Sequence, residues 1–377
     1  MADGLPPNVQ TIPAEEDLTH DFGSLGTAFP QSRVDFVDRW HRTPYALDYN
    51  LTIQHQVAEH LLEVRYFAKL GRKVNFRDYN INHIRPEDLS RTDIPERWRR
   101  PYTQYEGNAE VRMNQPNFGL SNYHAFTFKA EKRFAQGLGY LAAYTFSKWI
   151  DNVPFTGEDA ASLGDSDFHQ NIYDIRNERA LSTNHVPHRL VLSPIYELPF
   201  GRGKRWLDRG GVVDALFGGW QISTIATFQS GSPFGVTVQN GPRDLLGDNA
   251  PYRVLRANVV GDHRLPDSQQ GEPAVGRRGI QWFNPEAFAA PARFTLGNTG
   301  RTISGNLGPG LRVFDIAFSK NTRLTERYML QFRWETFNSF NNPEFSNPID
   351  QVFAAGMGTT TGGNSHREMQ FGLKLYF

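Results

Sequence analysis

Apolar and polar residues alternate along nine separate stretches of the chain. From Tyr45 to Val57, aromatic or aliphatic side chains take the odd positions, except at His55, and polar side chains take most of the even ones. Alternation of this kind puts the two classes of side chain on opposite faces of a β-strand. We therefore predict nine strands, at residues 45–57, 62–70, 126–134, 138–146, 190–198, 220–228, 314–318, 328–334 and 369–377.

The connections between these stretches alternate in length. Those after the odd-numbered stretches are shorter, at residues 58–61, 135–137, 199–218 and 321–327. Those after the even-numbered stretches are longer, at residues 71–121, 149–187, 230–311 and 339–368. Short turns on one side and long loops on the other are typical of outer-membrane barrels, whose tilted strands have about 9–11 residues. The predicted fold class is all-β, an antiparallel transmembrane β-barrel of the outer-membrane type.

The composition supports a barrel. The mean hydropathy is −0.53, and the longest stretch without charge alternates and contains glycine and proline, so we expect no membrane-spanning helix. The chain contains 28 Phe, 14 Tyr and 7 Trp. Tyr and Trp favour the membrane interface, where one side of the ring is apolar and the other can form a hydrogen bond. The candidates for a girdle of aromatic residues at this interface, which we call the girdle candidates, are Tyr49, Tyr144, Trp220, Tyr328 and Trp334.

Charged residues occur on the predicted polar faces of the strands. Inside a soluble core these groups would be costly, whereas the lumen of a large barrel holds water or a plug. Their placement therefore indicates a lumen-facing surface rather than a selective binding site. The residues are Glu63, Arg65, Lys129, Glu131, Arg133, Arg333, Glu335 and Lys374.

The number and direction of the strands indicate an incomplete barrel. Nine is odd, whereas bacterial single-chain barrels use even numbers of strands. The first and last predicted strands also both descend from the loop side. No basic stretch followed by an apolar one precedes them, so we expect no secretory signal peptide in the chain. We expect residues 1–44 to be an N-terminal tail or truncated outer loop, and 45–377 to be the C-terminal portion of a larger barrel.

Several stretches resemble a known family. NYHAFTFKAEKRFAQGLGYLAAYTFSKWIDN at 122–152 resembles the barrel of Oar-like TonB-dependent receptors, the group that carries a carboxypeptidase-regulatory-like domain at the N-terminus. Further similar stretches, in the family's order, are YELPFGRGKRW at 196–206, GGWQISTIATFQSGSPF at 218–234, WFNPEAFAAP at 282–291, RLTERYMLQFRWETFNSFNNPEF at 323–345 and MQFGLKLYF at 369–377.

This resemblance implies a barrel of about 22 strands around a plug, with energy-coupled uptake of a large solute across the outer membrane of a Gram-negative type of cell. No segment here resembles the plug, the TonB box or the regulatory-like domain. The implied partners are outer-membrane lipid, the barrel-assembly machinery, and the TonB complex through the missing N-terminal part. The assembly machinery would recognise the last strand through Phe371, Leu373, Leu375 and Phe377.

Three groups of residues could carry chemistry, and each has a simpler interpretation. His169, His185 and His188 could bind a metal, but lack an acidic residue at a matching spacing and are better explained as loop and rim histidines. Gly201–Lys204 superficially resembles a phosphate-binding loop but lacks its spacing, so a turn is expected. The loop at 157–167 could bind calcium but is expected to be a solvated loop; its acidic residues are Glu158, Asp159, Asp165 and Asp167.

We therefore expect no catalytic, cofactor-binding or metal site, and no enzymatic activity. Zero cysteine excludes thiol catalysis and cysteine-based metal sites. The charges balance, with 40 basic and 40 acidic residues, so no nucleic-acid partner is expected. The first functional hypothesis is a receptor barrel segment. The alternatives are a complete small barrel acting as a passive pore or adhesin, and a soluble β-rich protein, which would leave the apolar stripes unexplained.

Overall fold

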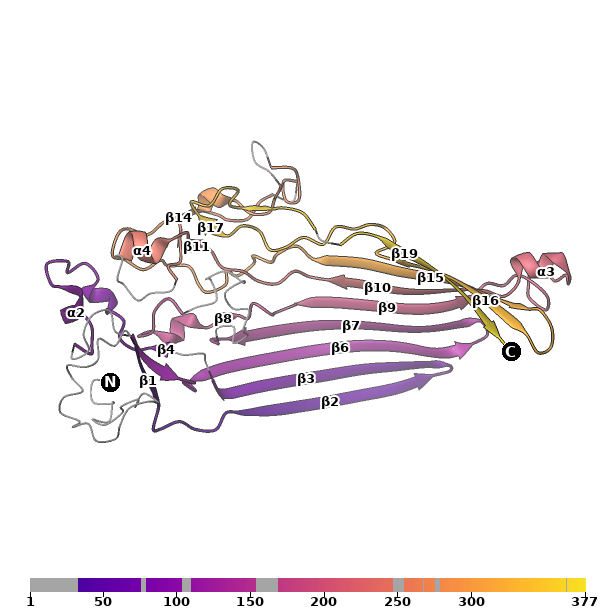
Figure 1. Cartoon of the computed structure of the whole chain (residues 1–377). Coiled ribbons are helices and arrows are strands. Elements are labelled where there is room, and N and C mark those ends of the chain that lie inside the picture. The colour runs from indigo at the N-terminus through magenta and orange to yellow at the C-terminus, as the bar shows by residue number, and fades with distance from the viewer. Residues whose placement is uncertain are drawn as a thin grey trace, which may run out of the picture.

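The computed structural model describes residues 33–75, 79–103, 110–153, 169–246, 254–266, 268–274, 279–363 and 365–377. Within them, nine long strands form one antiparallel sheet in which each strand pairs with the next along the chain (Figure 1). They are β2 (Tyr45–Val57), β3 (His60–Val74), β6 (Gly119–Ala135), β7 (Leu138–Asp151), β9 (His188–Glu197), β10 (Trp220–Gln229), β15 (Leu311–Arg323), β16 (Met329–Phe337) and β19 (Glu368–Tyr376).

All nine predicted strands are therefore confirmed, and so is the all-β antiparallel fold class. The largest difference between a predicted and an observed strand boundary lies at the loop end of β6, which begins seven residues before the predicted start at 126. There the backbone pairing with β3 continues through Asn122 and His124, although these polar residues break the apolar stripe. Pairing of the backbone, rather than side-chain pattern, decides where a strand ends.

The alternation of connection lengths is also confirmed. The connections at 58–59, 136–137, 198–219 and 324–328 lie at one end of the sheet, and those at 75–118, 152–187, 230–310 and 338–367 lie at the other. Figure 1 shows the two ends. At 136–137, Gln136 and Gly137 both have positive φ, as the central residues of a type I′ hairpin turn require.

The strand register brings the apolar stripes together on one face of the sheet. Ile53 faces Val64, which faces Phe128, and the same row continues through Tyr144, Leu190 and Phe228. A second row near the C-terminus joins Phe318, Trp334 and Phe371. Ile53, Val64 and Phe128 in the first row are exposed, and Phe371 in the second row is 70% exposed. An exposed apolar surface that crosses nine strands fits contact with lipid, and we call it the lipid face.

The opposite face carries most of the polar side chains, together with aliphatic residues such as Leu141 and Ile225, and we call it the lumen face. Gln54 donates to Glu63 at 2.6 Å, and Gln331 donates to Asn321 at 2.9 Å. Lys129 forms an ion pair of 2.7 Å with Glu131. Seven of the eight predicted inward charged residues pair with lumen-face positions, whereas Arg133 lies at the register shift between Lys132 and Ala135.

The girdle candidates all follow the lipid-face alternation but lie at different heights. Trp220 begins β10 and Tyr328 immediately precedes β16, so both lie at the turn end. Tyr49 and Trp334 lie toward the loop ends of their strands. Tyr144 lies midway along β7, and its hydroxyl forms a hydrogen bond of 2.8 Å with His188 Nδ1.

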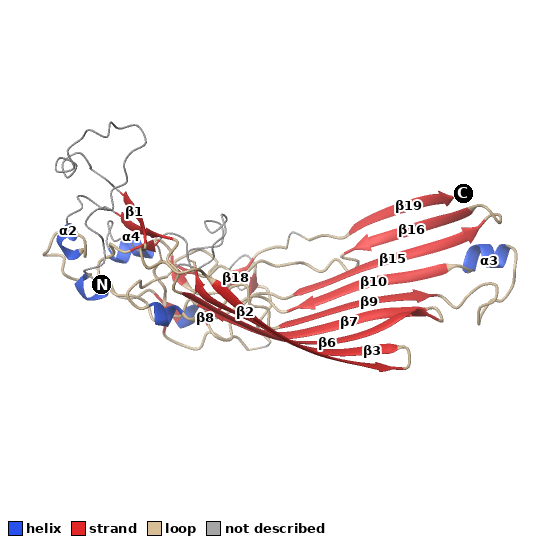
Figure 2. Cartoon of the chain, turned by 90° about the horizontal axis from the view of Figure 1, so that it is seen from below, coloured by secondary structure: helices blue, strands red, loops and turns tan. Residues whose placement is uncertain are grey.

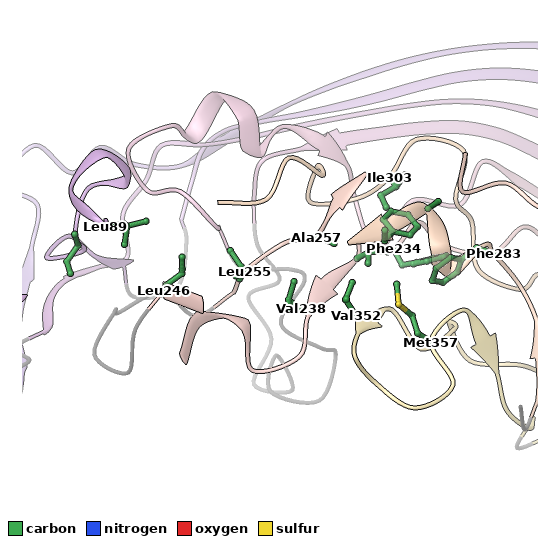
Figure 3. Packing of buried hydrophobic residues seen from close by; sticks show 14 residues of the cluster. Leu89, Phe234, Val238, Leu246, Leu255, Ala257, Phe283, Ile303, Val352 and Met357 are labelled. Carbon is green, nitrogen blue, oxygen red and sulfur yellow. The ribbon is translucent and has the colours of Figure 1, made fainter. Parts of the chain in front are cut away.

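The long loops form a folded unit, which we call the loop cap: the described residues of 75–118, 152–187, 230–310 and 338–367. Its core packs residues from three of these loops, including Leu89, Phe234, Phe283 and Met357 (Figure 3). None of the described helices is long and apolar enough to span a membrane.

The secondary structure of the loop cap is short. Its strand pairs are β4 (Tyr79–Asn80) with β5 (Glu110–Asn114), β11 (Thr237–Val238) with β17 (Gln351–Val352), β12 (Asn258–Val259) with β14 (Phe288–Ala289), and β13 (Ile280–Gln281) with β18 (Thr359–Thr360). β1 (Arg33–Val37), within the predicted N-terminal tail, pairs in parallel with β5, and β8 (Ala180–Leu181) pairs with β7. The helices are η1 (Pro86–Asp88), α2 (Glu96–Arg99), η4 (Ile175–Glu178), α4 (Gly241–Leu246) and η5 (Pro285–Ala287).

The two faces of the sheet can be distinguished by adjacent substitutions in β9. Leu192→Arg places a charge on the lipid face and should cost about 2–4 kcal/mol near the middle of the bilayer. Ser193→Arg, its matched control, places the same charge on the lumen face and should change stability little. The measurement is unfolding of the membrane-inserted barrel in denaturant; equal losses at the two positions would contradict the assignment of faces.

A second prediction follows from the backbone groups at the two edges of the sheet. β2 and β19 both run from the loop end to the turn end, so they cannot pair with each other as antiparallel neighbours. Their unpaired N–H and C=O groups would each cost several kcal/mol in hydrocarbon. Residues 1–377 expressed alone behind an added signal peptide should therefore be degraded or aggregate.

The same chain joined to strands that complete its barrel should insert into the outer membrane. Outer-membrane fractionation followed by a heat-modifiability gel measures this difference. A protease-resistant, heat-modifiable band from residues 1–377 alone would disprove the prediction and favour a small complete barrel.

Candidate functional site: the loop cap and the lumen wall

The three candidate histidines each contact a different protein group. His169 Nε2 lies 2.7 Å from the carbonyl oxygen of Asn152, and His185 Nδ1 accepts a hydrogen bond of 3.3 Å from the backbone N–H of Trp149. His188 contacts Tyr144, as described above. Burial lowers the pKa of both His169 and His185, which favours their neutral forms. No group of three or more His, Asp or Glu residues among the described parts of the chain could hold a metal ion.

The other two candidates have different outcomes. Residues 158, 159, 165 and 167, proposed as calcium ligands, lie outside the described residues. The Gly201–Lys204 segment is a turn, as expected. The N–H of Arg202 donates to Asp214 at 2.8 Å, and that of Gly203 donates to Asp208 at 2.7 Å. Carboxylates of the protein thus occupy two N–H groups that a phosphate-binding loop would direct at its ligand.

Buried ion pairs attach the loop cap to the sheet. Arg301, which is only 1% exposed, pairs with Asp151 at the outer end of β7. Arg256 pairs with Glu178, whose Oε1 also accepts from the backbone N–H of Gln170 at 3.0 Å. Three stretches of chain that lie far apart in sequence are thereby held together: the end of β7, the 169–187 segment and the 254–310 segment.

A further contact joins the first loop to this network. The hydroxyl of Tyr173 donates to the carbonyl oxygen of His83 at 2.6 Å, and the guanidinium carbon of Arg85 lies 5.6 Å from the Tyr173 ring centre. Burial raises the pKa of Tyr173 to about 12, so the hydroxyl stays protonated and can donate. The loop cap is therefore cross-linked from several loops, as a preorganised binding surface would be.

An aromatic groove lies on the lumen face where β2, β3, β6 and β7 meet the loop cap. Its volume is about 660 Å³, and its lining is mainly apolar. Tyr123 and Trp149 form an edge-to-face pair with ring centres 5.8 Å apart, and Phe67 lies 6.1 Å from Tyr123. Trp149 Nε1 donates to Ser121 Oγ at 2.8 Å, which fixes the indole ring.

The groove gathers aromatic side chains on a lumen face that elsewhere carries mainly polar residues and single aliphatic ones such as Ile195 and Ile225. Lys69 faces Tyr123 across the strands, so the groove combines aromatic surfaces with one cation. The aromatic rings can pack against flat apolar groups of a ligand, and the cation can bind a negatively charged group beside them. The sequence signal is an aromatic residue on the wrong phase of the alternation, such as Phe67 between Tyr66 and Ala68, and our sequence interpretation did not use it.

Solved structures with similar folds are outer-membrane proteins of greater length. The FrpB iron transporter of Neisseria meningitidis is 11% identical with a TM-score of 0.39, and the match covers 91% of this chain and 33% of that one. The outer membrane transporter YddB of Escherichia coli is 8% identical with a TM-score of 0.45, covering 92% and 34%. The pyoverdine outer membrane receptor FpvA of Pseudomonas aeruginosa is 11% identical with a TM-score of 0.41, covering 90% and 31%.

The chain thus spans about a third of the length of these proteins. No curated protein matches the chain at a significant level. The family model described as outer membrane beta barrel domain matches residues 2–370, nearly the whole chain. This match agrees with the lipid face, the lumen face and the alternating connections, and the chain belongs to the outer membrane beta barrel domain family.

Proposed function

We propose that the chain is the C-terminal part of the barrel of an Oar-like TonB-dependent receptor, which takes up a large solute across the outer membrane of a Gram-negative type of cell. The quoted family stretches support this assignment through their positions in the sheet. Residues 122–152 correspond to the β6–β7 hairpin and the start of the following loop. Residues 323–345 contain the turn before β16, the strand itself and the start of the next loop.

One observation carries the proposal: the sheet combines a lipid face with a lumen face whose aromatic groove lies at the loop end, where the strands lead into a packed loop cap. A passive pore needs only a polar wall and open loops. A receptor needs surfaces held in place to recognise a solute, and buried ion pairs and a shared core provide that here. In this proposal the plug and the TonB box belong to another part of the complete protein, and this part has no enzymatic role.

The last strand suits the proposed contact with the barrel-assembly machinery. β19 is an edge strand with β16 as its sole strand partner among the described residues. Its other edge is therefore open to strand addition. The apolar side chains that we propose as the recognised signal, Phe371, Leu373, Leu375 and Phe377, are all exposed.

Energy dependence tests the transport proposal. Cells that carry the complete receptor should accumulate one member of a panel of labelled large solutes, comprising ferric chelates, cobalamin, oligosaccharides and peptides. A protonophore or loss of TonB should abolish that uptake. Uptake that persists under both conditions would identify a passive pore instead.

The aromatic groove can be tested in the same assay. Trp149→Ala should reduce uptake of the solute several-fold, because it removes the ring that packs edge-to-face on Tyr123. Phe146→Ala removes an aromatic side chain of the same strand from the lipid face and is the matched control. The amount of inserted receptor is measured by heat-modifiability; equal uptake by the two variants would exclude a role for the groove.

The attachment of the loop cap gives another expected result. Arg301→Ala removes the guanidinium group that pairs with the buried Asp151 carboxylate, which should cost about 3–5 kcal/mol of local stability. Protease added to intact cells should then cleave the 254–310 segment, while the strands stay protected by the membrane. Arg243→Ala, at an exposed arginine of the same loop, is the control. The proposed role of the ion pair is wrong if both variants are cleaved at the wild-type rate.

A further inference from the structure

The turn-end connection between β9 and β10 is much longer than a hairpin needs. It spans residues 198–219 and contains the helix α3 (Val212–Phe217), whereas two of the other turn-end connections contain two residues each. Figure 2 shows α3 at the opposite end of the sheet from the other helices. Its apolar side chains are exposed: Val212 by 74%, Leu216 by 59% and Phe217 by 52%. Trp206 and Leu207, earlier in the same connection, are also about half exposed.

Contacts with β10 and β15 place the end of α3 beside the lipid face. Trp220 follows the lipid-face alternation of β10, and its indole Nε1 donates to the carbonyl oxygen of Leu216 at 2.9 Å. Lys320, the register partner of Trp220, lies with its Nζ 5.5 Å from the Trp220 ring centre and donates to the carbonyl oxygen of Gly218 at 2.5 Å. The exposed apolar residues of α3 therefore continue the lipid face beyond the turn end of the sheet.

Basic residues accompany this apolar surface. Within the described residues, no ion pair joins Arg202, Arg205 or Arg209 to an acid, and the guanidinium carbon of Arg205 lies 5.5 Å from the Trp206 ring centre. The two acids of the connection, Asp208 and Asp214, accept hydrogen bonds from backbone N–H groups of the turn, as described above. Three arginines are therefore available to bind an anion next to the apolar helix.

We propose that residues 198–219 bind the surface of the periplasmic leaflet of the outer membrane. The apolar side chains of α3 enter the boundary between headgroups and acyl chains, and Arg202, Arg205 and Arg209 bind the phosphate groups of anionic phospholipids. Continuity with the lipid face and the local positive charge both favour lipid over a periplasmic protein. The inference rests on the orientation of the barrel and does not depend on the proposed transport function.

Residues 1–377 contain no cysteine, so an introduced cysteine is the single thiol of this part of the barrel and allows a direct test. Single cysteines replace Leu216, Phe217 or the control Gly210, which is exposed on the same connection and where an added Cβ would meet no atom within 4 Å. Each is spin-labelled in the complete, membrane-inserted barrel, reconstituted in vesicles of phosphatidylethanolamine with phosphatidylglycerol. Labels at 216 and 217 should collide several-fold more with oxygen and less with a water-soluble nickel chelate than the label at 210.

The contribution of the arginines is tested with the triple variant Arg202→Gln, Arg205→Gln and Arg209→Gln. It should raise nickel access at 216 and 217 in vesicles that contain phosphatidylglycerol and change it little in vesicles of phosphatidylcholine alone. Nickel access at 216 and 217 equal to that at 210 would overturn the proposal. Exclusion of both oxygen and nickel from 216 and 217 would also overturn it, because that pattern indicates a covering protein surface. The heat-modifiability gel confirms that each labelled protein is folded.

Discussion

The hydrogen bonding of the backbone in hydrocarbon is the constraint on which the structure depends. A strand that crosses a bilayer must pair its N–H and C=O groups with neighbouring strands, because lipid offers them no partner. Sequential antiparallel pairing from β2 to β19 meets this demand for the seven strands between them. The alternation of side chains then follows, since each strand shows one face to lipid and the other to the lumen.

The loop cap is stabilised differently from the sheet, because it lies in water and not in lipid. It combines a core of small and large apolar side chains, such as Val236 and Phe283, with buried ion pairs that would be costly if either partner were missing. Asp151 lies where the two environments meet, at the outer end of β7. One carboxylate there attaches a loop segment to the wall of the barrel.

The strands and their faces could be predicted from the sequence because both depend on local alternation. Ile53 and Phe371 were assigned to the apolar face from their neighbours alone, and the register confirms both positions. The loop core could not be predicted in this way, because Leu89, Phe234 and Met357 come from separate loops without any period. The pair of Arg301 and Asp151 lies 150 residues apart in sequence, and no local pattern connects its members. The aromatic groove was visible only as a local exception to the alternation at Phe67.

Because the two edge strands, β2 and β19, run in the same direction, they restrict the number of strands that a closed antiparallel barrel of this kind can contain. Each turn-end connection joins two strands into a hairpin, and the described sheet contains four such hairpins followed by β19 alone. Duplication or loss of a whole hairpin changes the number of strands by two. Such a change therefore leaves β19 as the one strand that no turn joins to a neighbour. An antiparallel barrel that closes on this sheet therefore needs an odd number of further strands.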